Sequence, residues 1–148
     1  RPERHSYPLI RERGEFAINL VSRPLLRACD WCGVRSGRDG DKFAAAGLTR
    51  APASKIAAPL VAESPVNLEC RVTQVLELGS HHMFLAEIVA VDVEESLLDG
   101  SGLDRAELIH YTHGEYFAQG EKLGSFGYTV RGPGRKKTQR FVPPSAEK

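Results

Sequence analysis

The most regular feature of the sequence is an alternation of apolar and polar positions between residues 66 and 78. Successive side chains of a strand point to opposite faces, so the pattern predicts one long strand with an apolar and a polar face. The apolar positions are Val66, Leu68, Cys70, Val72, Leu76 and Leu78, and the polar ones are Asn67, Glu69, Arg71, Thr73 and Glu77. Gly79-Ser80 interrupts the pattern, and residues 83–93 predict a second strand, largely apolar on both faces. Two long strands with a short connection predict an antiparallel hairpin, which is typical of a barrel wall.

Short helices and one strand are predicted ahead of this hairpin. Residues 6–14 predict a helix, because Ser6 is a good N-cap and Gly14 suits the left-handed position that ends a helix. The alternating apolar residues of segment 15–21 predict a strand. Further helices are expected over residues 22–33 and from Asp39 or Asp41 to Ala46, before Gly47.

The remaining segments predict loops and turns. Residues 48–64 carry Pro52 and Pro59 and predict a loop, and residues 111–128 mix aromatics with glycines, which indicates extended segments and turns. Residues 131–148 form a basic, proline-containing tail that we expect to be disordered. Early helices and later strands together predict an α+β fold, mainly β: a small β-barrel with short helices at its periphery.

Composition and charge narrow the class of protein. With 148 residues, of which 41% are apolar and 26% charged, one globular domain is expected. The net charge of +1 favours neither nucleic acid nor membrane as a partner, and no apolar run approaches the roughly 20 residues of a membrane helix. Three cysteines are too few for a disulfide framework, which favours a reducing cytoplasm. The only methionine is Met83, so we expect that Arg1 is not a natural translation start.

The first candidate for chemistry is the segment Arg1-Pro2-Glu3-Arg4-His5-Ser6, which leads directly into a predicted helix. A helix N-terminus has unpaired N–H groups and a partial positive charge, and it is therefore a natural site for a phosphate. Arg1 or Arg4 could add a bidentate contact and Ser6 a hydroxyl donor. The alternative is a solvated basic segment with an ordinary helix cap.

Two polar loops are further candidates. Residues 32–43 combine glycine, serine and charge, so the backbone could approach a ligand while Lys42 supplies positive charge; a polar connection between helices is an equally good interpretation. Gly79-Ser80-His81-His82 lies at the predicted hairpin tip, where a histidine could meet a ligand at a barrel mouth or could simply be solvated.

Aromatic and cysteine pairs complete the candidates. Tyr116 and Phe117, beside Gly114, could stack on a planar ligand or close one end of the barrel core. Cys29 and Cys32 have the spacing of a redox dithiol or half a zinc site. They fall near the end of a predicted helix, however, where the helix dipole raises the thiol pKa. No metal site is therefore predicted.

Four segments, in this order, resemble the flavin reductase-like family, and within it the flavoredoxin-like branch. They are Ser36-Gly37-Arg38-Asp39 with Asp41-Lys42-Phe43, Asn67-Leu68-Glu69-Cys70, Gly79-Ser80-His81 and His113-Gly114-Glu115-Tyr116. The resemblance extends from Arg1 to about residue 130, so residues 1–130 are expected to form the domain and 131–148 the tail. It implies a split β-barrel that binds FMN, with its first strands ahead of Arg1.

The resemblance also implies roles for individual residues. Arg1 and Ser6 match the positions that hold the phosphate and ribityl chain of FMN. Lys42 falls in a motif near the cofactor, and His81 matches a position close to the flavin and the nicotinamide, which makes it the candidate catalytic residue. Tyr116 or Phe117 is expected to pack on the isoalloxazine.

The implied activity is an NAD(P)H-dependent reductase, a cytoplasmic homodimer that passes hydride from NADH or NADPH to FMN and then to flavin, a ferric chelate or a protein acceptor. Two alternatives stay open: a flavoredoxin-type electron-transfer protein that does not oxidise NAD(P)H, and a non-catalytic FMN-binding module.

Overall fold

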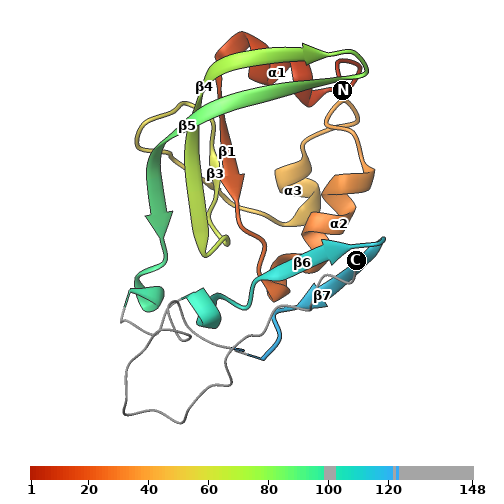
Figure 1. Ribbon diagram of the computed structural model, residues 1–148. Coiled ribbons are helices and arrows are strands. Elements are labelled where there is room, and N and C mark those ends of the chain that lie inside the picture. The colour runs from red at the N-terminus through yellow and green to blue at the C-terminus, as the bar shows by residue number, and fades with distance from the viewer. Residues whose placement is uncertain (99–102, 122, 124–148) are drawn as a thin grey trace, which may run out of the picture.

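The computed structural model describes residues 1–98, 103–121 and 123 and has a mainly β architecture (Figure 1). Its largest element is the long hairpin of β4 (Val66–Leu78) and β5 (His81–Val93), and β1 (Glu15–Asn19) pairs with the other edge of β4. All three strands are antiparallel to their neighbours. The predicted hairpin and the strand ahead of it are therefore confirmed, although β5 begins two residues earlier than expected.

The tip of the hairpin is a tight turn. Leu78 pairs with His81, so only Gly79 and Ser80 connect the two strands. Gly79 has φ 76°, a left-handed conformation that glycine adopts without the steric cost that a Cβ atom would bring. This turn places His81 at the first position of β5.

Along β4, the predicted separation into an apolar and a polar face is wrong. The register between β4 and β5 shifts between Glu69 and Cys70 and again between Val72 and Gln74. The first shift skips Val89 of β5, whereas the second skips Thr73 of β4 and interrupts the alternation of faces along β4 itself. Asn67 and Glu69, expected on the polar face, lie before both shifts and are nevertheless buried, with 8% and 0% of their surfaces exposed. Glu69 is covered by the backbone of residues 54–56, which donates hydrogen bonds to its carboxylate.

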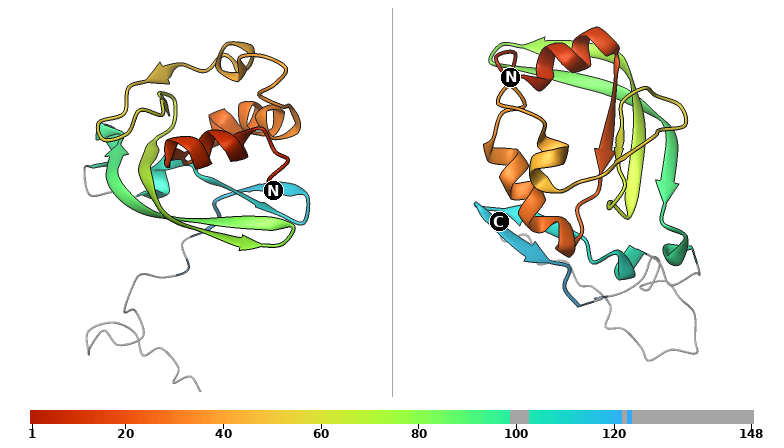
Figure 2. Two further views of the ribbon diagram at one scale, coloured as in Figure 1. Left: turned by 90° about the horizontal axis from the view of Figure 1, so that it is seen from above. Right: turned by 180° about the vertical axis from the view of Figure 1, so that it is seen from behind.

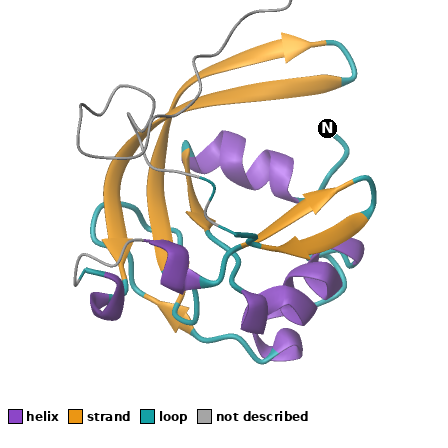
Figure 3. Ribbon diagram, turned by 60° about the horizontal axis from the view of Figure 1, so that its bottom comes forward, coloured by secondary structure: helices purple, strands orange, loops and turns teal. Residues whose placement is uncertain are grey.

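Helix α1 (Ser6–Arg13) lies where the sequence predicts it, and the curved sheet wraps around it (Figures 2 and 3). Gly14 ends it with φ 67°, and its N–H donates to the Ile10 carbonyl at 2.9 Å. The predicted cap is wrong, because Ser6 is the first helical residue and His5 precedes it without a side-chain cap. No side chain caps the first turn of α1; the Tyr7 N–H donates to the Arg4 carbonyl at 3.1 Å and Pro8 has no N–H, which leaves the Ser6 N–H at the helix start.

Two further helices follow β1. The 3₁₀ turn η1 (Arg23–Leu25) leads into α2 (Leu26–Val34), which continues through Gly33 instead of ending there. Helix α3 (Lys42–Ala46) begins after Asp41, whose side chain accepts from the Phe43 N–H at 3.0 Å and thereby caps it.

The loop predicted over residues 48–64 contains two short strands, β2 (Arg50–Ala51) and β3 (Leu60–Val61), which pair antiparallel. Strands of two residues carry no periodic signal, which explains why the sequence did not reveal them. Beyond β5 come η2 (Glu95–Leu97), η3 (Leu103–Ala106) and the hairpin of β6 (Ile109–Thr112) and β7 (Glu115–Ala118).

The elements meet in a small core. Val66, Leu97 and Ala106 are buried together, and Leu20, Leu68, Val93 and Leu108 pack against them. The predicted extended segments are confirmed as far as residue 118, and the predicted disordered tail at 131–148 lies outside the described residues.

Glu69 is a fully buried residue whose carboxylate binds the loop of residues 54–56. Its carboxylate accepts from the N–H groups of Ser54, Lys55 and Ile56 at 2.7, 2.6 and 3.1 Å, and from the Ser54 hydroxyl at 2.9 Å. Burial alone would raise the pKa of this carboxyl, but the hydrogen bonds from Ser54 and Lys55 lower it below its usual value. Glu69 therefore fixes residues 54–56 onto the sheet as a carboxylate.

The carboxyl of Asp92, which pairs with Asn67 across the sheet, has a pKa that shifts in the opposite direction. Burial, followed by the negative charge of Glu69, raises the pKa of the Asp92 carboxyl. Its Oδ2 atom and the Asn67 Oδ1 atom are buried, and neither has a hydrogen-bond partner within the described part of the chain. Folding therefore favours the protonated form of Asp92.

We expect this carboxyl to make stability fall as the pH rises. The unfolded chain releases the Asp92 proton at about pH 4, whereas the folded chain holds it to higher pH. Between these two pKa values deprotonation stabilises the unfolded state more than the folded state, so the free energy of unfolding falls as the pH rises. Asp92→Asn, which keeps the shape without the proton, should reduce the loss of stability above pH 4 in urea titrations. Glu87→Gln, on the exposed part of β5, is the control. Equal pH profiles for wild type and Asp92→Asn would contradict this assignment.

Candidate functional site

The start of the chain meets the tip of the β4–β5 hairpin (Figure 1). The Arg1 Nε atom donates to the His81 Nε2 atom at 3.3 Å, and the Ser80 hydroxyl lies 3.0 Å from the His81 Nδ1 atom. Arg1 also forms an ion pair with Glu3 at 3.3 Å. The structure therefore brings together Arg1 and His81, two predicted site residues that are 80 positions apart in the sequence.

A hydrogen-bond network fixes the hairpin tip against α1. The Tyr7 hydroxyl lies 2.8 Å from the His82 Nδ1 atom, and Arg11 donates both to the Tyr7 hydroxyl and to Glu77, the latter at 3.0 Å. The hydrogen bond from Arg11 lowers the pKa of Glu77, so this carboxyl is ionised at neutral pH. The network orients His82 towards Tyr7 and leaves the adjacent His81 at the edge that faces Arg1.

Ser6, at the first position of α1, is exposed, and its hydroxyl has no hydrogen-bond partner among the described residues. The first turn of α1 contains no acidic residue, and two arginines, Arg1 and Arg4, precede it. An uncapped helix start with a free hydroxyl and nearby guanidinium groups has the donors and the charge that a phosphate dianion requires. The residues present therefore fit the phosphate of a flavin mononucleotide.

Lys42 lies at a second position, at the start of α3. Its Nζ atom donates to the Cys32 carbonyl at 2.6 Å, and its side chain lines a cavity of about 330 Å³ between α2 and α3. The loop before α3 contacts the N-terminal segment, because the Arg38 Nη2 atom donates to the Glu3 carbonyl at 3.3 Å. The structure thus places Lys42 in a neighbouring cavity instead of in contact with the Arg1–His81 pair.

Tyr116 and Phe117 lie on β7, against α2. The Tyr116 hydroxyl donates to Asp30 at 3.1 Å and its ring packs on Tyr111 at a centroid distance of 5.0 Å. Burial, followed by the hydrogen bond to Asp30, raises the pKa of Tyr116. Phe117 is 45% exposed. Neither residue contacts Arg1 or His81 through a hydrogen bond or ring contact of the described chain, and their packing on a flavin stays a prediction.

Cys29 and Cys32 are free thiols that line an apolar cavity of about 200 Å³ beside β1. Burial, followed by the nearby charges of Cys32 and Asp30, raises the pKa of Cys29. A protonated thiol is a poor nucleophile and a poor metal ligand. Within the described ranges, no group of three or more His, Cys, Asp or Glu side chains is placed to hold a metal ion.

We therefore expect Cys29→Ser to leave the affinity for FMN unchanged within about twofold, since serine is nearly isosteric and the thiol has no role in the site. Fluorescence titration of FMN against both proteins measures this. Loss of FMN binding in Cys29→Ser would instead revive the dithiol interpretation.

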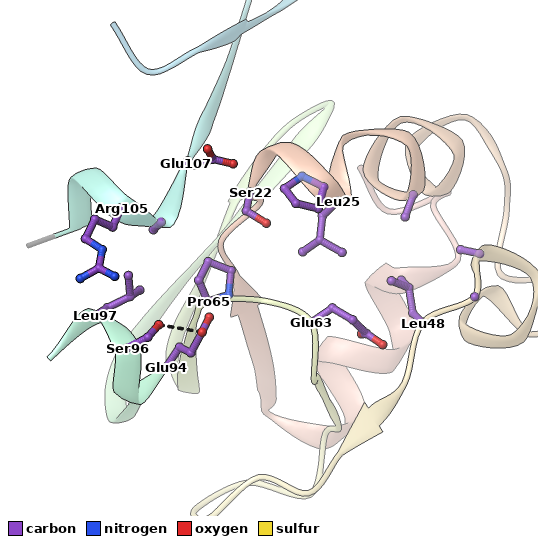
Figure 4. Close-up of a pocket in the computed structure, with 15 residues that line it drawn as sticks. Ser22, Leu25, Leu48, Glu63, Pro65, Glu94, Ser96, Leu97, Arg105 and Glu107 are labelled. Carbon is purple, nitrogen blue, oxygen red and sulfur yellow. Dashed lines mark hydrogen bonds between the residues drawn. The ribbon is translucent and has the colours of Figure 1, made fainter. Parts of the chain in front are cut away.

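A larger cavity of about 450 Å³, which the sequence did not indicate, lies at the opposite end of the fold (Figure 4). Figure 4 shows Ser22 and Leu25 on one side and Leu97 and Arg105 on the other. The Ser96 hydroxyl donates to Glu94 at 2.7 Å at its edge. Its lining comes from short segments that are scattered along the sequence, and no motif joins them.

Comparisons with known proteins agree with this geometry. A sequence model of the flavin reductase-like domain matches residues 1–125. The flavoredoxin of Desulfovibrio vulgaris (Miyazaki F) has 33% sequence identity and a TM-score of 0.80, with 88% of this chain and 73% of that chain covered. A protein from Shewanella frigidimarina, described as a flavin reductase with a split barrel domain, has 26% identity and a TM-score of 0.74, with coverage of 86% and 67%.

Among curated proteins, an uncharacterised protein of Archaeoglobus fulgidus is 31% identical over 115 residues. That alignment covers 77% of this chain and 65% of the relative, so the chain spans about two thirds of the relative's length. The chain belongs to the flavin reductase-like domain family, and its mainly β architecture with short helices is that of the split-barrel proteins of this family. In the described residues, no helix is long and apolar enough to cross a membrane.

Proposed function

We propose that this protein is an FMN-dependent oxidoreductase that accepts hydride from NADH or NADPH and passes electrons to a flavin, a ferric chelate or a protein. The observation that carries the proposal is the pairing of Arg1 with His81 beside the uncapped start of α1. Arg1 and the start of α1 can bind a phosphate, and the His81 imidazole is hydrogen-bonded directly to Arg1. Membership of the flavin reductase-like family supports the proposal.

The residues have distinct tasks in this proposal. Arg1 and Ser6 hold the phosphate of FMN, Ser6 through its hydroxyl and its backbone N–H at the first position of α1. His81, whose Nδ1 atom lies beside the Ser80 hydroxyl, would supply a polar contact for charge that develops on bound flavin. Bound FMN supplies the two-electron chemistry, and the protein supplies orientation and electrostatics.

A homodimer is part of the proposal, and the surface of the sheet supports it. Large apolar side chains of β1, β4 and β5 are exposed in the single chain, namely Ile18, Leu78, Met83, Leu85, Ile88 and Val91. Leu85 and Ile88 lie on opposite faces of β5, so these side chains are exposed on both sides of the sheet. Exposed apolar side chains in this number favour a surface that a second chain covers. We place the protein in the cytoplasm, as its unpaired cysteines favour.

A thermal titration tests the cofactor. FMN at about 100 times its dissociation constant should stabilise the folded protein by about 2.7 kcal/mol and raise its melting temperature, whereas riboflavin, which lacks the phosphate, should give a much smaller rise. Equal effects of FMN and riboflavin would contradict the phosphate site at α1. No effect of either would contradict flavin binding.

Flavoredoxin-type electron transfer without NAD(P)H oxidation is the second candidate, and the similarity to the Desulfovibrio flavoredoxin favours it. The two candidates differ in the electron donor. If a reduced protein donor bleaches the FMN-loaded protein while NADH and NADPH do not, the second candidate holds.

A further inference from the structure

The cavity between α2 and α3 is lined by one aromatic ring and several charged side chains. Its volume is about 330 Å³, and its wall combines the ring of Trp31 with two cations, Arg35 and Lys42. Two carboxylates, Asp39 and Asp41, also line it, so its formal charge is balanced.

The two carboxylates are already engaged by the protein. Asp41 forms an ion pair with Arg50 at 2.6 Å and caps α3, and the hydrogen bond from Arg50 lowers its pKa. Asp39 accepts from the Ser36 N–H at 3.3 Å. Their negative charge is therefore partly neutralised inside the protein before any ligand arrives.

The cations are more available. The exposed Arg35 guanidinium has no hydrogen bond or ion pair within the described part of the chain, and Lys42 makes a single hydrogen bond to a neutral carbonyl. The charge that this cavity can offer to a ligand is thus positive. It lies beside an indole, whose face can stack on a planar base.

The cavity is also connected to the Arg1–His81 site. The loop of residues 36–40, which lines the cavity, packs directly on the N-terminal segment. A Cβ atom at Gly37 would lie 2.8 Å from the His5 ring, so only glycine allows this approach. With the Arg38–Glu3 hydrogen bond, this contact makes the two sites neighbours on one surface. A ligand with two halves could therefore occupy both.

We infer that the cavity formed by Trp31, Arg35 and Lys42 binds the adenosine diphosphate half of a dinucleotide. The base would stack on Trp31 and the phosphates would meet the two cations, because guanidinium and ammonium groups are strong donors to phosphate. The inference rests on the proposed function, which takes a nicotinamide dinucleotide as electron donor. FAD also contains an adenosine diphosphate half, so the experiment is designed to distinguish FAD from a nicotinamide dinucleotide.

Trp31 is the only tryptophan of the chain, and its fluorescence reports the cavity directly. ADP-ribose, which is colourless, should quench this fluorescence saturably, whereas nicotinamide mononucleotide at equal concentration should not. Arg35→Ala should raise the dissociation constant of ADP-ribose roughly tenfold or more, as loss of a charge-assisted contact to phosphate does. Arg27→Ala is the matched control, because Arg27 is an exposed arginine of α2, the helix that ends just before Arg35, and lies outside the cavity lining.

Turnover then identifies the source of the adenosine half. For a nicotinamide dinucleotide, Arg35→Ala should raise the KM for NADH or NADPH and leave that for reduced nicotinamide mononucleotide unchanged. If Arg35→Ala instead weakens FAD but not FMN, the site remains an adenosine site and belongs to FAD.

Three results would overturn the inference: equal quenching by both nucleotides, an unchanged dissociation constant in Arg35→Ala, or an equal loss of FMN affinity in Arg35→Ala, which would assign the cavity to FMN. The failure of the inference is distinct from that of the proposed function. If NADH reduces the flavin but ADP-ribose does not bind, the assignment of the cavity is wrong and the proposed function still holds. ADP-ribose binding is measured without any turnover, so it does not depend on the reductase activity.

Discussion

Replacing Glu69 with alanine is expected to lower the melting temperature of the protein by roughly 10 °C or more, the largest stability effect that the structure predicts for one side chain. The carboxylate is fully buried and accepts four hydrogen bonds from residues 54–56. Alanine would leave three backbone N–H groups without an acceptor in a site closed to water, and each unsatisfied group is costly. Circular dichroism melts of both proteins measure the effect.

Two variants control this experiment. Glu87→Ala removes an exposed carboxylate from β5 and should melt close to wild type. Glu69→Gln keeps the shape but loses charge and one acceptor oxygen, so it should lie between wild type and Glu69→Ala. If Glu69→Ala melts within about 2 °C of wild type, the hydrogen bonds do not fix residues 54–56 as the structure indicates.

Arg1→Ala is expected to raise the dissociation constant of FMN by roughly tenfold to a hundredfold, because a guanidinium contact to phosphate is among the stronger hydrogen bonds in proteins. Ser6→Ala, which removes a neutral hydroxyl donor, should cost less, roughly fivefold. Titrations that follow the quenching of FMN fluorescence give both constants.

Arg13→Ala is the matched control, since it removes an exposed arginine from the C-terminal end of α1, the helix that Arg1 precedes. It changes the net charge equally but lies away from the helix start. An equal loss of affinity in Arg13→Ala and Arg1→Ala would indicate a general charge effect instead of a phosphate site. Full affinity in Arg1→Ala would contradict the site itself.

The elements that the sequence predicts well are those with a repeating local signal. The 13-residue strands of the long hairpin carry an extended pattern, and Gly14 and Gly47 mark two helix ends, where they adopt φ 67° and 68°. These features depend on neighbours in the chain. The four-residue strands of the last hairpin were indicated less directly, through their aromatic and glycine content.

The features that the sequence did not reveal depend on distant contacts. Glu69 was expected on the polar face of its strand, but the backbone N–H groups of residues 54–56 cover it and make a buried position favourable. In the site, the meeting of Arg1 with His81 was implied only by the family resemblance, since no local pattern joins residues 80 positions apart. The hydrogen bond that holds Lys42 at the Cys32 carbonyl had no sequence signal.

The proposed function requires that this protein carries FMN and reduces it with a nicotinamide nucleotide. Anaerobic mixing of the FMN-loaded protein with NADH or NADPH, followed through the visible absorbance of oxidised flavin, tests it most directly. We expect complete bleaching by at least one of the two nucleotides, and slower or weaker bleaching in the Arg1→Ala protein. A flavin that stays oxidised with both nucleotides, yet is bleached by dithionite, would contradict the claim.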